Sequence, residues 1–140
     1  MSHDSIVAKL RITPVGPFHA MLETITLVDR GNQWLVKVVA RERFGDGTAT
    51  QRLAIPVEES VVRNHLALLK GATVPAYPCS PMTLDGEEIE LTVHGEGSSL
   101  TLQWWTIVPT GAEVVGEFVQ WLRGVVKQGV QNGLNSTAGE

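Results

Sequence analysis

The stretch that decides the fold lies in residues 84–122, which begin LDGEEIELTVHGEGSSLTLQWWTIVP and continue to Leu122. Apolar and polar residues alternate on both sides of Gly95-Glu96-Gly97, which predicts two antiparallel strands joined by a tight turn. Apolar residues then recur at helical spacing as far as Leu122, which predicts an amphipathic helix. Three of the four tryptophans fall in this stretch, so we expect it to supply much of the core.

The alternation places the two adjacent tryptophans of this hairpin on opposite faces. Trp104 shares a face with leucine, isoleucine and valine, so we expect it in the core. Trp105 shares the other face with Glu88 and Glu90, where it needs cover from a second element or from a partner. Because tryptophan is enriched at interaction hot spots, Trp105, Glu88 and Glu90 are candidate interface residues. Packing of Trp105 beneath the proline-rich segment 72–83 is the alternative interpretation.

Four alternating segments precede this stretch, and they predict an antiparallel meander over residues 5–13, 18–28, 33–44 and 48–55. If Arg30-Gly31 and Asp46-Gly47 are two-residue hairpin loops, apolar residues face apolar residues on one face of both hairpins, except at Glu23.

This register has consequences for the charged residues. It places Arg41 directly opposite Arg52 and collects them with Lys37 and Arg43 on one face. This cationic face complements the acidic face of the later hairpin, so Arg41, Arg43 and Arg52 are further interface candidates.

Two helices complete the predicted fold. Pro56 and Gly71 bracket apolar residues at helical spacing over residues 57–70, and Thr110 and Glu113 match the spacing of a capping box before the last helix. The sequence therefore predicts an α+β fold: an antiparallel β-sheet (four-stranded meander, then helix, hairpin and C-terminal helix) with the two helices packed on one face. Residues 1–128 are predicted to form one domain, and residues 129–140, which have lost the periodicity, a flexible C-terminal tail.

Composition restricts the classes of function. The chain has 140 residues and a net charge of −4, which fits one globular domain and disfavours nucleic acid as a partner. It has one cysteine, no signal-peptide pattern and no apolar run long enough to cross a membrane, so we expect a cytoplasmic protein that has no membrane partner.

No catalytic, cofactor or metal motif stands out, so we expect no cofactor and no metal. Cys79 would need His65 or His94 beside it to act as a nucleophile, and the four histidines lack the spacing of metal ligands. Enzymatic activity is therefore the less favoured expectation.

Glu23 is the anomaly of the meander, because the predicted register places it opposite Val38 in an apolar row that also holds His19. A buried carboxylate must be paired, solvated or protonated, and a polar group within an apolar concavity is typical of ligand pockets. His19 and Glu23 are therefore ligand-pocket candidates, while a rim position or a shifted register is the alternative.

These observations predict a non-enzymatic interaction domain that self-associates, as a homodimer, or binds a protein partner. The alternative is a small-ligand-binding protein or enzyme with a pocket around His19 and Glu23. The order of elements is loosely similar to that of small acidic bacterial secretion chaperones, which are dimeric effector-binding proteins. This similarity lies in element order alone, because a strand replaces their N-terminal helix and no motif is shared.

Overall fold

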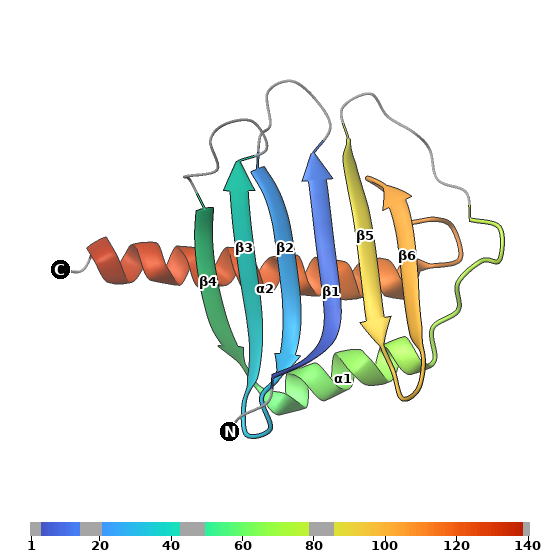
Figure 1. Ribbon diagram of the computed structural model, residues 1–140, viewed down its shortest axis with the longest axis horizontal. Helices are drawn as coiled ribbons and strands as arrows, with labels where there is room; N and C mark the ends of the chain where they lie inside the picture. Colours follow the sequence, from blue (N-terminus) through green and yellow to red (C-terminus); the bar gives the residue numbers. More distant parts are fainter. Residues whose placement is uncertain (1–3, 15–20, 43–49, 79–85, 139–140) are drawn as a thin grey trace.

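The strands form one antiparallel sheet, and both helices lie on the same face of it (Figure 1). The computed structural model describes residues 4–14, 21–42, 50–78 and 86–138. The elements in these residues are β1 (Ser5–Pro14), β2 (Met21–Asp29), β3 (Trp34–Glu42), β4 (Thr50–Val57), α1 (Glu59–Lys70), β5 (Glu87–His94), β6 (Ser99–Trp105) and α2 (Glu113–Ala138). The α+β class with an antiparallel sheet is therefore confirmed.

The hairpin of β5 and β6 lies beside β1, a placement that the sequence left open. The strand order is β4-β3-β2-β1-β5-β6, so the first strand of the chain becomes an interior strand of the sheet. Leu10 lies between Ile25 of β2 and Leu91 of β5, and all three side chains are buried. Burial between neighbouring strands on both sides explains why β1 is almost free of polar residues on its inner face.

A β-bulge near the start of β1 changes the face of one predicted core residue. The pairing with β2 shifts between Ile6 and Ala8, so Ile6 no longer shares a face with Ala8 and Leu10. Ile6 is 48% exposed, whereas alternation alone placed it in the core. A bulge adds one residue to a strand, and it thereby reverses the faces before it.

The two predicted registers in the meander are each wrong by two residues. Leu27 faces Val36, where a two-residue loop at Arg30-Gly31 would have placed Trp34, and Glu23 faces Ala40, where that loop would have placed Val38. The actual loop is longer: the N–H of Arg30 donates to the carbonyl of Gln33 at 2.9 Å. A slip of two residues keeps every side chain on its face, so the predicted inner face is correct although its pairs are not.

The same slip occurs between β3 and β4, where Val38 faces Leu53. Arg41 therefore lies opposite Thr50, and the predicted Arg41–Arg52 pair does not form. The predicted loop at Asp46-Gly47 lies outside the described residues.

The core fills the space between the inner face of the sheet and the two helices. Val62 of α1 and Phe118 and Leu122 of α2 are buried against the inner residues of the strands. Arg123 of α2 also binds Glu87 of β5 through two hydrogen bonds of 3.1 and 3.2 Å. Helix α2 runs across the strands, whereas α1 covers only one end of the sheet (Figure 1).

Helix α2 differs from its prediction at both ends. Its first residue is Glu113, whose carboxylate accepts hydrogen bonds from the N–H of Gly111 at 3.0 and 3.1 Å, and no described hydrogen bond gives Thr110 the capping role that was expected. The helix continues to Ala138, well beyond the loss of apolar periodicity after Lys127. Gly129 allows this part of the helix to lie directly against β4, because a Cβ at this residue would lie 2.4 Å from Cδ1 of Ile55.

Candidate functional site

The face of the sheet turned away from the helices, which we call the outer face, carries most of the predicted interface residues. Neither described helix covers it (Figure 1). Residue parity places Trp105, Glu88, Glu90, Arg41 and Arg52 on this face, as the sequence predicted. Arg43 lies outside the described residues, so its position stays a prediction.

The rows of residues that cross the outer face show how its charge is divided. One row runs from Arg52 through Val39, Thr24, Arg11 and Glu90 to Gln103. In the next row Thr50 pairs with Arg41 and Arg41 with Leu22, while at the other side of the sheet Glu88 pairs with Trp105. The cations therefore belong to β1, β3 and β4, and the acids to β5.

Several charges of the outer face have no partner in the part of the chain that the structure describes. Neither Arg41 nor Arg52 forms a hydrogen bond or ion pair there, and the same is true of Glu90. Glu88 accepts a hydrogen bond from the amide of Gln103. Trp105 is half-buried and has an interaction of its own. Its cover by the proline-rich segment or by a partner stays a prediction.

Sequence reasoning missed a cluster of charges at one end of this face. Asp4 accepts hydrogen bonds from Arg30 at 3.0 Å and from Lys37 at 2.8 Å. These two cations lower the pKa of Asp4 from 3.8 to about 2. Asp4 precedes the first strand and belongs to no pattern, so nothing in the sequence indicated that it joins the loop after β2 to β3.

Glu23, the pocket candidate, lies on the opposite, inner face, in a groove where α2 crosses the end of β4. The groove has a volume of about 570 Å³, and its apolar walls come from the sheet and from one side of the helix. They include Met21, Val38, Ala40, Leu53, Val126 and Val130. Glu23 is half-buried, and Gln51 follows Ala40 in the same cross-strand row. His19 lies outside the described residues, so its convergence with Glu23 stays a prediction.

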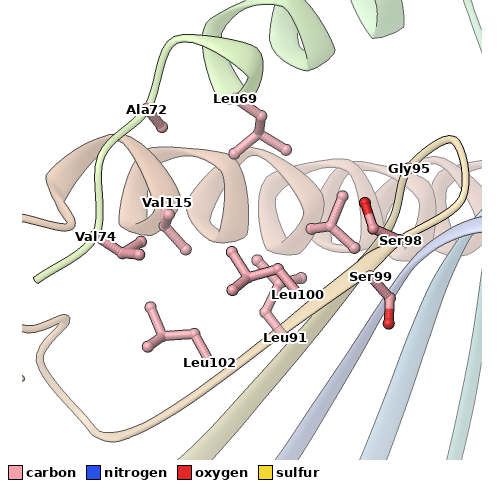
Figure 2. Close-up of a pocket in the computed structure, with 11 residues that line it drawn as sticks. Leu69, Ala72, Val74, Leu91, Gly95, Ser98, Ser99, Leu100, Leu102 and Val115 are labelled. Carbon is pink, nitrogen blue, oxygen red and sulfur yellow. The ribbon is translucent and has the colours of Figure 1, made fainter. Parts of the chain in front are cut away.

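A second hollow lies between the end of α1 and the β5–β6 hairpin. Figure 2 shows Leu69 of α1, Val115 of α2 and Leu102 of β6 around it, with the hydroxyls of Ser98 and Ser99 at one end. Its volume is about 250 Å³. No charged side chain lines it among the described residues, so the two serine hydroxyls are the described side-chain groups that could orient a polar ligand there.

The histidines and the cysteine do not form a reactive centre in the described residues. His65 stacks on Trp121 with a ring-centroid distance of 4.2 Å, and burial lowers its pKa below 6.5. His94 is exposed at the end of β5, and Cys79 lies outside the described residues. Among the described side chains, no three of His, Cys, Asp or Glu gather as metal ligands would.

Comparisons with known proteins add no assignment to this geometry. The helices of the described chain are each too short or too polar to span a bilayer. No family model, no curated protein and no solved structure matches the chain.

Proposed function

We propose that this protein is a non-enzymatic interaction domain that forms a homodimer through the outer face of its sheet. One observation carries this proposal: a six-stranded face that neither described helix covers divides its charge. Arg41 and Arg52, which have no partner among the described residues, lie toward β4, and the acids Glu88 and Glu90 lie on β5. A charge division of this kind is self-complementary when a second copy is turned over onto the first.

The strand order defines the two-fold rotation that would relate the two copies. A two-fold axis that lies parallel to the strands, between β1 and β2, divides the sheet into β4-β3-β2 and β1-β5-β6. Rotation about this axis lays β3 over β5 of the second copy and β4 over β6, while each row keeps its height along the strands. Arg41 then lies over the partner's Glu88, since the two residues occupy the same row.

The other outward residues fit the same arrangement. Arg52 of β4 lies over the partner's Gln103, and Trp105 lies over the partner's Thr50 at the margin. Face-to-face sheets pack about 10 Å apart, a gap that an arginine and a glutamate can close from opposite sides. Near the centre Arg11 lies over the partner's Thr24 and Glu90 over the partner's Val39, and these two opposite charges are cross-strand neighbours within each copy.

The size of the face sets the expected strength of the dimer. With strands about 4.8 Å apart and residues about 3.3 Å apart, the six strands offer roughly 800 Å² per copy. A stable interface usually buries about 800 Å² per partner. The face is therefore just large enough for a stable dimer, and a concentration series measures its affinity.

A charge-reversal series tests the contact directly. Arg41→Glu and Glu88→Arg each face a like charge in the dimer, and each contact occurs twice, so each variant is expected to weaken dimerisation by more than about tenfold. The double variant Arg41→Glu/Glu88→Arg recreates the pair with its charges exchanged, and we expect it to recover the dimer. Light scattering coupled to size exclusion over a concentration series gives the mass of each species.

Arg63→Glu is the matched control, because Arg63 lies on α1 and pairs with Glu59 on the same helix, away from the outer face. This variant should dimerise as the unchanged chain does. A chain that is monomeric at every concentration would overturn the proposal, as would a double variant no better than the two single ones.

A further inference from the structure

The groove that holds Glu23 has the chemistry of a binding site, and it lies on the opposite face of the sheet from the proposed dimer contact. Its walls join the ends of β2, β3 and β4 to the second half of α2. Val38 and Leu53 face each other across the strands at its floor, and Val126 and Val130 come from the helix. Val130 is 46% exposed, although it is apolar and sits beside other apolar side chains.

Glu23 is the one acid among the described residues that line this groove. Within the described chain its carboxylate forms neither a hydrogen bond nor an ion pair, even though the residue is half-buried. A half-buried carboxylate beside apolar walls gains from an opposite charge that meets it. Pairing with a cation is therefore a requirement that the described residues leave open in this groove.

Arg52 also lines the groove, but it does not meet that requirement. It pairs with Val39, which points to the outer face, whereas Glu23 and Gln51 belong to the inner row that runs through Ala40. Arg52 reaches the groove only around the free edge of β4, and no ion pair joins it to Glu23. Gln51, the next residue of the inner row, supplies a neutral amide that can donate to or accept from a ligand.

We propose that this groove binds an aliphatic primary amine, with its ammonium group on Glu23 and its hydrocarbon chain along Val38, Leu53, Val126 and Val130. Three features favour this class: an apolar channel, a single carboxylate at one side of it, and the amide of Gln51, which lies on the other side of Ala40 in the same inner row. A volume of about 570 Å³ is within the usual range of small-ligand pockets and accommodates a chain of about eight carbons. This proposal does not depend on the homodimer, because Glu23 and the apolar walls lie on the inner face; Arg52, on the edge strand β4, borders both surfaces.

Three ligands of equal length separate charge from hydrophobicity. Octylamine, octanol and octanoate share one chain and differ only in the head group, and isothermal titration calorimetry gives the affinity of each. We expect octylamine to bind at least about tenfold more tightly than octanoate, because the first meets an opposite charge and the second a like one. The affinity of octanol should lie between those of octylamine and octanoate.

Three substitutions test where the ligands bind. Glu23→Gln keeps the shape of the side chain, and it should reduce octylamine binding to the level of octanol. Ala40→Phe fills the floor beside Glu23 and should abolish binding of all three ligands. Glu90→Gln, which removes an outer-face carboxylate, is the matched control and should change nothing.

Several results would contradict the proposal. Octanoate binding as tightly as octylamine, or unchanged amine binding by Glu23→Gln, would remove the role of the carboxylate. Amine binding that survives Ala40→Phe but disappears in Glu90→Gln would place the ligand on the outer face. Far-ultraviolet circular dichroism of each variant establishes that it is folded, and light scattering of the same samples tests dimerisation separately.

Discussion

Gly129 is the residue at which the structure makes its sharpest quantitative prediction. Glycine within a helix is normally a weakness, and its replacement by alanine stabilises an exposed helix by up to about 1 kcal/mol. At Gly124, on the same helix, a Cβ would have nothing within 4 Å of it, so alanine there should show this gain in full. At Gly129 the added Cβ would lie 2.4 Å from Cδ1 and 2.7 Å from Cγ1 of Ile55.

Ile55 cannot yield cheaply to the new methyl group. Rotation about χ2 moves Cδ1 away, but Cγ1 is attached to a branched Cβ whose χ1 angle is stiff. Either Ile55 changes its χ1 rotamer or α2 moves away from β4, and such overpacking typically costs about 1–3 kcal/mol. We therefore expect Gly129→Ala to be less stable than Gly124→Ala by about 1–3 kcal/mol, although the chemical change is identical.

Urea unfolding followed by circular dichroism measures both variants, at one protein concentration because any dimerisation adds to stability. Ile55→Ala provides the internal check, since it removes the three side-chain atoms that the new Cβ would approach. In that background Gly129→Ala should become stabilising, as at Gly124. If Gly129→Ala stabilises the unchanged chain as much as Gly124→Ala does, then α2 does not lie against β4, and the groove beside Glu23 is wrong with it.

Three further changes test the core and the ionisable groups. Phe118→Ala removes a fully buried ring and should lower the free energy of unfolding by about 3–5 kcal/mol in a urea titration. Because burial lowers the pKa of His65, the unfolded chain binds a proton at this residue at a higher pH than the folded chain does, and the stability of the fold should fall as the pH drops below 6.5. His65→Phe can still stack on Trp121, and thermal scans of this variant should show a weaker dependence of stability on pH. Arg30 and Lys37 lower the pKa of Asp4 to about 2, so the contribution of this carboxylate to the stability of the fold is present above pH 3.8 and is lost as the pH falls toward 2. Acid unfolding titrations of Asp4→Asn should lack this loss of stability.

The faces of the sheet could be predicted from the sequence because they depend only on residue parity. Alternation placed Trp104 inside and Trp105 outside, and it placed Glu23 on the inner face, as the structure has them. Ile6 is the exception, since the bulge after it changes the parity and has no signature in the residues themselves. The placement of β5 beside β1 depends on tertiary packing, which no local pattern records.

The end of α2 shows a different limit of sequence reasoning. Glycines and polar residues after Lys127 remove the apolar periodicity, and they have low helix propensity, so the pattern predicts that the helix ends. In the structure residues of this segment make tertiary contacts: Gly129 permits contact with Ile55, and Val130 lines the groove. Packing of one helical face therefore outweighs propensity over this segment.

The two-residue error in register matters more for function than for the fold. A slip of two leaves every side chain on its face, so the core and the fold class are unaffected. It moves each residue by one row, however, and the proposed dimer contact is defined by rows. In the predicted register Arg41 stood beside Arg52, and these two like charges would repel each other. In the structure Arg41 faces Thr50 and shares its row with Glu88, so one two-fold rotation brings opposite charges together. Because loop length sets the row, it decides which charges would meet in the proposed dimer.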